Sequence, residues 1–281
     1  MIYNRYMKFY YFGGVIGDNQ LAELEDNYIE GVLFTYNPHQ GDFFTLLARD
    51  IDTTKKIKYM IAIRPYTISP QYLCMINKSI NSIMKDRLQI NLIAGHIKGK
   101  EKDFGGFVDE ITDYSPIPDR SNYLIKYIKE LSNMAKDPRI EIPDYYVSCT
   151  NGYLFQSAAL NESKIILPYQ DYINKYFTEQ GGIDTPIKIG ETFTTKGKKI
   201  MLAINPLLRE TQGELDKKFF QRVKPTTDSD FFTYQEFYNL IKQLEKDDIH
   251  EILIGGWPTH EKLHILKFVK RYVESEESFQ I

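Results

Sequence analysis

The stretch YMIAIRPYTISPQYLCMINKSINSIMKDRLQINLIAG, residues 59–95, contains the pattern that decides the fold. Two apolar runs of strand length, 58–64 and 88–95, enclose a stretch in which apolar residues recur at helical spacing. Ser69 precedes that stretch in the position of a helix N-cap, so we expect a helix within 69–86. Strands that are apolar on both faces are typical of parallel sheets buried between helices. The stretch therefore predicts a strand–helix–strand unit.

The same alternation continues along the rest of the chain. Helices are expected over 120–136 and over 233–247, where Thr233 and Glu236 form a capping box. Eight strands alternating with helices in 281 residues predict an α/β fold, a (β/α)8 TIM barrel. No linker interrupts the pattern, so we expect a single domain over 1–281. The six further strands are expected at 8–13, 30–36, 144–149, 164–169, 199–206 and 250–256.

Composition excludes several classes of protein. The net charge is −3 and the basic residues are scattered, so no nucleic-acid surface is expected. No apolar stretch is long enough to span a membrane, and the first residues lack the features of a signal peptide. We therefore expect a soluble, cytoplasmic protein. Cys74 and Cys149 alone give neither a disulfide framework nor a cysteine-rich metal site.

One motif points to a different chemistry. His260-Glu261-Lys262-Leu263-His264 has the His-Glu-x-x-His spacing of zinc peptidases. A third zinc ligand is expected downstream, but the remaining acidic residues lie in a polar tail that looks disordered. The apolar stripe of this segment runs through Leu263, Leu266, Val269 and Val273, with Thr259 as N-cap. We expect surface histidines on the last barrel helix and no metal site, with a zinc peptidase as a remote alternative.

A series of motifs in order along the chain resembles the bacterial luciferase-like flavin-dependent monooxygenases, especially their alkanesulfonate monooxygenase branch. The strand at 58–64 ends in Ala-x-Arg-Pro, Ser-Pro opens the next helix, and the strand at 88–95 carries Ile-Asn-x-x-x-Gly. The resemblance covers nearly the whole chain. The later matches are YYVSCTN at 145–151, LLRET at 207–211 and IGGWPTHEKL at 254–263.

The resemblance implies a luciferase-like barrel that binds reduced FMN, or the deazaflavin F420 in some members. It implies oxygen activation as a flavin C4a-(hydro)peroxide and reduced flavin supplied by a separate NAD(P)H:flavin reductase. It also implies a homodimer or homotetramer. It places the active site at the carboxyl-terminal ends of the barrel strands, because the active sites of (β/α)8 barrels lie at that end.

Several residues of this chain fall on the family's cofactor positions. Asn91 matches a residue that contacts the flavin ring, although a buried amide satisfied by the backbone remains the alternative. Ala62 would lie beneath the ring, where a small side chain leaves room for flavin and oxygen. The phosphate-binding loop, or else an ordinary turn, is expected at Ser148, Cys149, Thr150 and Asn151.

The candidate catalytic residues are Arg64, His96, Asn205 and Trp257. Arg64 equally fits a structural ion pair, and His96 equally fits a plain loop histidine. Trp257 would pack against substrate or flavin, or would plug the mouth of the barrel.

The sequence departs from the family at positions that bind anions. Asn205 stands where the sulfonate branch has its catalytic His, and Ala203 stands where that branch has an Arg. The glycines of the phosphate loop are replaced by Ser148 and Cys149, and the family's Arg-Tyr pair reads Ile117 and Pro118. A sulfonate substrate is therefore not expected.

The leading interpretation is a two-component FMN-dependent monooxygenase acting on a neutral or bulky organic substrate, either a small molecule or one tethered to a carrier. The alternatives are a flavin-binding or flavin-storing protein, an F420-dependent oxidoreductase and a barrel that has lost flavin binding.

Overall fold

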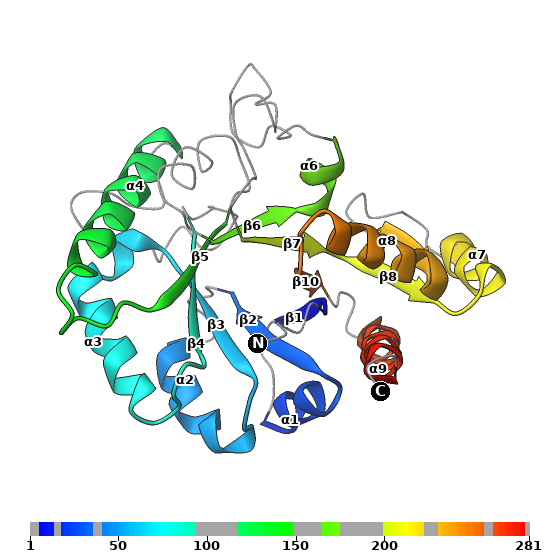
Figure 1. The fold of residues 1–281 in the computed structure, drawn as a ribbon, viewed down its shortest axis with the longest axis horizontal. Helices are drawn as coiled ribbons and strands as arrows, with labels where there is room; N and C mark the ends of the chain where they lie inside the picture. The colour runs from blue at the N-terminus through cyan, green and yellow to red at the C-terminus, as the bar shows by residue number, and fades with distance from the viewer. Residues whose placement is uncertain are drawn as a thin grey trace.

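Eight parallel strands close into a barrel in the computed structural model of the chain (Figure 1). Their order around the barrel is β1-β10-β7-β6-β5-β4-β3-β2, and each neighbouring pair is parallel. The (β/α)8 barrel predicted from the sequence is thus confirmed. The barrel strands are β1 Lys8–Gly13, β2 Ile29–Phe34, β3 Lys58–Ile63, β4 Leu88–Leu92, β5 Asp144–Ser148, β6 Lys164–Pro168, β7 Ile200–Ile204 and β10 Glu251–Gly255. The structure describes residues 6–13, 18–35, 41–93, 117–148, 164–174, 199–221, 230–255 and 261–278.

Helices surround the strands on the outside of the barrel (Figure 1). Within the described residues, no helix has the length and apolar character to cross a membrane. The prediction of one domain over 1–281 stays a prediction. The helices are α1 Asp18–Asp26, α2 Phe43–Asp50, α3 Pro70–Asn81, α4 Ile117–Met134, α6 Tyr169–Asn174, α7 Gln212–Gln221, α8 Tyr234–Lys246 and α9 Lys262–Ser278, with short 3₁₀ turns at Ile51–Thr53 and Pro65–Thr67.

The predicted helix caps are present. Ser69 Oγ accepts a hydrogen bond from the Tyr72 N–H at 3.2 Å, and α3 begins at the following residue. Thr233 Oγ1 accepts from the Glu236 N–H at 3.2 Å, while Glu236 Oε2 accepts from the Thr233 N–H at 2.7 Å. These reciprocal bonds satisfy N–H groups that have no partner inside a helix, which fixes where α8 begins.

The strand expected at 199–206 is divided in two. The barrel strand β7 ends at Ile204, and Pro206–Arg209 forms β8, which leaves the barrel and pairs in parallel with β9 (Asp230–Thr233). Pro206 has no N–H to donate to a barrel neighbour, so the break falls where the barrel ladder would lose a bond. Figure 1 shows β8 and α7 beyond the barrel, on its right-hand side.

The last helix differs from its predicted form. Leu263, expected in the buried stripe, is 67% exposed, whereas Phe268 and Tyr272 are buried. The rings decide this orientation, because Phe268 packs edge-to-face against Phe237 with ring centroids 5.0 Å apart.

The polar tail, expected to be disordered, is helical: α9 extends to Ser278, and Glu276 accepts hydrogen bonds from Tyr238 Oη at 3.2 Å and Lys242 Nζ at 2.7 Å.

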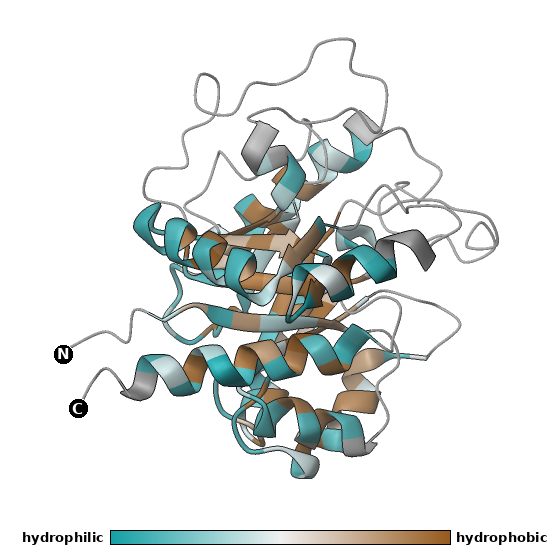
Figure 2. Cartoon of the chain, turned by 90° about the vertical axis from the view of Figure 1, so that its right-hand side faces the viewer, coloured by the Kyte–Doolittle hydropathy of each residue, from teal (hydrophilic) through white to brown (hydrophobic). Residues whose placement is uncertain are grey.

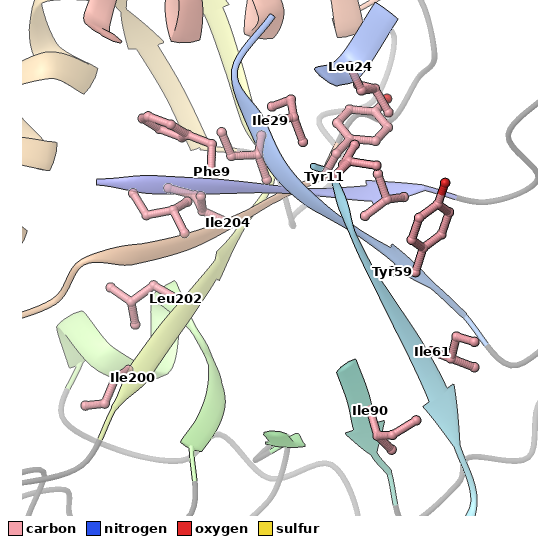
Figure 3. Close-up of a cluster of buried hydrophobic side chains, with 14 of the residues drawn as sticks. Phe9, Tyr11, Leu24, Ile29, Tyr59, Ile61, Ile90, Ile200, Leu202 and Ile204 are labelled. Carbon is pink, nitrogen blue, oxygen red and sulfur yellow. The ribbon is translucent and has the colours of Figure 1, made fainter. Parts of the chain in front are cut away.

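Alternate residues of each strand enter two different cores. The first core lies between strands and helices and contains side chains such as Phe9, Tyr11, Tyr59 and Leu202 (Figure 3). Figure 2 shows the same division by hydropathy, with apolar strands inside and hydrophilic helix surfaces outside. The second core fills the barrel itself. It is formed by Tyr10, Leu33, Met60, Ala62, Tyr146, Ile166, Met201 and Leu253.

Polar side chains close the end of the barrel where the strands begin. Buried Glu251 accepts a hydrogen bond from Tyr146 Oη at 2.8 Å and forms an ion pair with Lys199 Nζ at 2.5 Å. Gln89 Nε2 donates to Asp144 Oδ2 at 2.9 Å. Burial, and then the neighbouring tyrosine and Glu251, raise the pKa of Tyr146, so its hydroxyl remains a proton donor. This end of the barrel is thus closed by a cluster of buried polar side chains.

Gly31 leaves room for the Tyr10 ring inside the barrel. A Cβ at Gly31 would lie 2.6 Å from Cε1 of Tyr10, which is fully buried beside it. We predict that Gly31→Ala lowers the free energy of unfolding by about 1–3 kcal/mol, because the Tyr10 ring must shift inside a filled core. Chemical denaturation measures this change. Gly213→Ala is the control, since no atom lies within 4 Å of a Cβ there; equal destabilisation by both changes would contradict the steric argument.

Candidate functional site

Most of the inward side chains become smaller where the strands end. Alternate strands of such a barrel contribute the four side chains of one layer. On β1, β3, β5 and β7, one layer holds Tyr10, Met60, Tyr146 and Met201, which are all fully buried. The next layer along the same strands holds Phe12, Ala62, Ser148 and Ala203. Two alanines and a serine are smaller than the side chains of the layer below, so we expect the filled interior of the barrel to end at this layer.

A single polar side chain lies in the floor of that opening. The intervening strands supply Leu33, Asn91, Ile166 and Leu253, and Asn91 is 3% exposed among these apolar side chains. Ser148 Oγ donates a hydrogen bond to Asn91 Oδ1 at 2.9 Å. This bond satisfies the amide oxygen and leaves the NH₂ group to donate elsewhere. The structure thus brings together three predicted cofactor residues, Ala62, Asn91 and Ser148.

Phe12 is the large side chain of the open layer. It follows Tyr10 on the inward face of β1, and its two chain neighbours behave differently: Tyr11 is buried in the outer core and Gly13 is buried. Phe12 is 43% exposed, whereas Tyr10 is fully buried. Phe12 could not be identified from the sequence, because residues 9–12 of KFYYFG are all aromatic and do not show which side chains point inward.

Asn205 and Gly255 form a second feature of the mouth. Asn205 follows β7 on the inward face, beyond Met201 and Ala203, and is partly buried. A Cβ at Gly255 would lie 2.9 Å from Asn205 Oδ1 and 3.2 Å from Asn205 Cβ. The Asn205 carboxamide therefore lies over the backbone of β10, in space that only a glycine leaves open.

Arg64 follows directly on β3 and is 3% exposed. Its carbonyl accepts hydrogen bonds from the Thr67 N–H at 2.9 Å and from Thr67 Oγ1 at 2.7 Å, which hold the 3₁₀ turn after the strand. A role for Arg64 in catalysis stays a prediction. The predicted site residues His96, Cys149, Thr150, Asn151 and Trp257 lie outside the described part of the chain.

The His-Glu-x-x-His motif supplies a buried carboxylate. Glu261 is 2% exposed and accepts hydrogen bonds from Arg209 Nη1 at 2.6 Å and Nη2 at 3.1 Å, with Lys218 Nζ at 3.1 Å. Burial by itself would raise the pKa of Glu261, but the bonds from Arg209 and Lys218 outweigh it and lower the pKa to about 2.

The carboxylate thus joins α9 to the segment that leaves the barrel after β7. His264 is partly buried, and burial followed by the charge of Arg209 lowers its pKa. His260 lies outside the described residues, so its expected position at the surface stays a prediction. Among the residues that the structure describes, no group of three or more His, Cys, Asp or Glu side chains could hold a metal ion.

Comparison with known proteins confirms the expected resemblance. Pyrimidine monooxygenase RutA of Caulobacter segnis is 30% identical over 96 residues, which are 34% of this chain and 26% of that protein. The match therefore spans about a quarter of the relative's length. No protein-family model matches the chain.

Solved structures match the chain over almost its whole length. The riboflavin lyase RcaE, solved with modified FMN and riboflavin, has a TM-score of 0.68 at 10% identity and covers 97% of this chain and 92% of its own. The long-chain alkane monooxygenase LadA gives 0.65 at 10% identity, with coverage of 97% and 92%. The F420-dependent tetrahydromethanopterin reductase of Methanopyrus kandleri gives 0.61 at 11% identity, with coverage of 94% and 96%. At these identities the matches establish the (β/α)8 barrel fold.

The buried carboxylate yields a stability prediction. Glu261→Gln should lower the free energy of unfolding by about 3 kcal/mol at neutral pH, because it leaves Arg209 buried without a carboxylate. Chemical denaturation measures the difference. Glu210→Gln is the control, since Glu210 pairs with Lys267 and Arg271 at the surface and should leave the midpoint nearly unchanged.

The same pair of proteins gives a pH test. The pKa of Glu261 lies below its ordinary value of 4.5, so the stabilisation is complete above that pH and is lost as the pH falls through about 2. The gap between wild type and Glu261→Gln should therefore shrink in this window. A gap that stays constant down to pH 2 would show that the carboxylate charge is not its origin.

Proposed function

We propose that the protein is a flavin-dependent monooxygenase that binds reduced FMN at the open end of its barrel. One observation carries the proposal: Asn91, the polar side chain of an otherwise apolar inward layer, accepts a hydrogen bond from Ser148 of the next layer, where most inward side chains are small. Flavin sites combine an apolar slot for the ring with a few polar groups that orient it. The resemblance, the fold and the similarity to RutA support the same activity.

The inward residues fit a flavin ring. Ala62 and Ala203 leave the layer open, and the NH₂ group of Asn91 can donate to a carbonyl oxygen of the ring. Ser148 holds the amide in that orientation through its hydrogen bond at 2.9 Å. Ser148 would also begin the phosphate-binding loop, which continues through Cys149, Thr150 and Asn151. When bound, reduced flavin supplies the electrons that activate molecular oxygen.

The protein supplies binding and shielding in this proposal. Large buried side chains below the open layer and the polar plug at the other end keep water out of the barrel interior. Arg64, His96, Asn205 and Trp257 remain the candidate catalytic residues. The described inward residues at the mouth carry no cation on the β7 side, where Ala203 and Asn205 lie, so we propose an uncharged organic substrate rather than a sulfonate.

The relatives act on diverse molecules. RutA is named for pyrimidine, LadA for long-chain alkanes and RcaE for riboflavin. We therefore assign no single substrate from the comparison, and both a small molecule and a carrier-tethered one remain compatible. An F420-dependent oxidoreductase is the second candidate, favoured by the matching fold of the tetrahydromethanopterin reductase. A flavin-storing protein would share the cofactor site and lack turnover.

Two protein partners belong to the proposal. A separate NAD(P)H:flavin reductase would supply reduced flavin, as the resemblance implies. A second copy of the chain would cover the hollow between α2 and α3, which has a volume of about 880 Å³ and is lined by Phe43, Phe44 and Ile76 among others. Tyr72 and Met75 of α3 line this hollow and are 57% and 64% exposed. Exposed apolar surface of this kind marks interaction sites.

Reduced FMN binding tests the function directly. Anaerobic titration of the purified protein should show saturable binding, and Asn91→Leu should weaken it roughly tenfold or more, because a ring carbonyl loses its donor inside an apolar slot. Asn239→Leu, at an exposed position of α8, is the matched control.

Admission of air after the titration separates the candidates. A monooxygenase should change the course of flavin reoxidation relative to free FMN, whereas a storage protein should only slow it. Binding of F420 with no binding of reduced FMN would replace the leading candidate by the second, and equal FMN affinity in wild type and Asn91→Leu would refute the placement of the ring.

The oligomeric state tests the α2–α3 surface. Met75→Glu should shift the wild-type oligomer towards monomer, because it places a charge in an apolar contact. Light scattering coupled to gel filtration gives the mass of each species. Gln235→Glu adds the same charge on exposed α8 and should have no effect; a monomeric wild type, or a Met75→Glu protein of unchanged mass, would contradict the proposal.

A further inference from the structure

The base of the barrel, where the strands begin, contains two buried polar atoms that the described contacts leave unsatisfied. Tyr10 Oη and Gln89 Oε1 have no hydrogen-bond partner among the described residues, and their side chains are 0% and 2% exposed. Burying such atoms unsatisfied costs free energy, and proteins satisfy nearly all of them with protein groups or ordered water. The groups around the two atoms indicate which of these applies here.

The polar side chains of the base meet inside the barrel. Tyr10 projects inward from β1, and Tyr146, inward on β5, donates a hydrogen bond to Glu251 Oε2 at 2.8 Å. Burial, followed by the negative charge of Glu251, raises the pKa of Tyr10, while the Gln89 and Tyr146 side chains beside its hydroxyl oppose this rise. Tyr10, Gln89 and Glu251 therefore lie close together, and the Tyr10 hydroxyl keeps its proton at neutral pH.

The bonds that these groups already make limit what each can still offer. Gln89 Nε2 donates to Asp144 Oδ2 at 2.9 Å, which turns the amide oxygen of Gln89 away from that carboxylate. Glu251 Oε1 lies 2.5 Å from Lys199 Nζ, and a carboxylate oxygen can accept a second hydrogen bond. The Tyr10 hydroxyl is a donor. The base thus offers one donor and two acceptors.

One donor and two acceptors match a water molecule, which accepts one hydrogen bond and donates two. Buried waters in proteins make about three hydrogen bonds to groups of this kind. An anion would face two acceptor oxygens, and a metal ion would compete with the Lys199 ammonium group for Glu251 Oε1. A neutral molecule with two donor groups therefore suits the base better than an ion of either sign.

We infer that the base of the barrel binds one ordered water molecule, which accepts a hydrogen bond from Tyr10 Oη and donates to Gln89 Oε1 and Glu251 Oε1. Among the described strands, β4 pairs with β3 and β5 and shares no ladder with β1 or β10, so the water joins β4 to these two strands across the barrel. It also holds the Tyr10 ring, which lies against Gly31. The site is independent of the proposed flavin, which binds at the other end.

A crystal structure of the full chain, at a resolution that shows ordered waters, tests the site. One water should lie within about 3.2 Å of Tyr10 Oη, Gln89 Oε1 and Glu251 Oε1. The result does not depend on flavin binding. A structure without water between the three atoms, or with the Tyr10 hydroxyl bonded directly to Gln89 Oε1, would overturn the inference.

A double-mutant cycle measures the same link in solution. Tyr10→Phe removes the hydroxyl, Gln89→Met removes the amide, and chemical denaturation gives the unfolding equilibrium constant of each single variant and of the double variant. Because the water joins the two groups, the effect of the double variant should differ from the product of the single effects by about threefold or more. An effect equal to that product would contradict the link.

Tyr127→Phe is the matched control. The Tyr127 hydroxyl is also buried without a hydrogen-bond partner among the described residues, but it belongs to α4 and packs in the core outside the barrel. Its effect should combine with that of Gln89→Met to within about twofold of the product. If Gln89→Met does not fold, the wild-type crystal structure decides the question.

Discussion

The structure depends on the need to fill the inside of a closed barrel. Once eight parallel strands close, every second side chain points into a space of fixed width, and that space must be filled without voids. Tyr10 lies against Gly31 for this reason, and Met60, Tyr146 and Met201 complete its layer. The site appears where this filling stops. Ala62, Ser148 and Ala203 are too small to continue it, so the opening is a property of residue volume on strands that are otherwise regular.

Two buried polar side chains inside the barrel, Glu251 and Asn91, have hydrogen-bond partners. Glu251 accepts a hydrogen bond from Tyr146 and forms an ion pair with Lys199, and Asn91 accepts a hydrogen bond from Ser148. An unpaired polar group at these depths would cost about 1–3 kcal/mol, so each pair also fixes the orientation of its members. For Asn91 this fixed orientation is what makes the amide useful to a ligand. The fold and the proposed cofactor contact thus depend on the same hydrogen bond.

Local signals in the sequence predicted the barrel well. The strands recur where apolar runs were expected, and the caps at Ser69 and Thr233 form as their side chains require. Motifs tied to strand ends led to Ala62, Asn91 and Ser148. Long-range packing escaped prediction. The expected buried stripe of α9 is right at Leu266 and Val269 and wrong at Leu263, since Phe268, which packs against Phe237, is buried instead. The Arg209–Glu261 pair joins residues far apart in the chain. The exposure of Phe12 was missed because it depends on the small inward residues of neighbouring strands.

The separate pairing of β8 with β9 has a consequence for how such a protein can diverge. The segment between β7 and α8 holds its own two-stranded sheet, with α7 between the strands, and attaches to α9 through Arg209 and Glu261. In the described part of this segment, 206–221 and 230–233, the strands pair only with each other and not with the barrel strands. Insertions and deletions here would leave the register of the eight strands untouched. Selection can therefore reshape one wall of the entrance during evolution while the architecture beneath it is inherited unchanged.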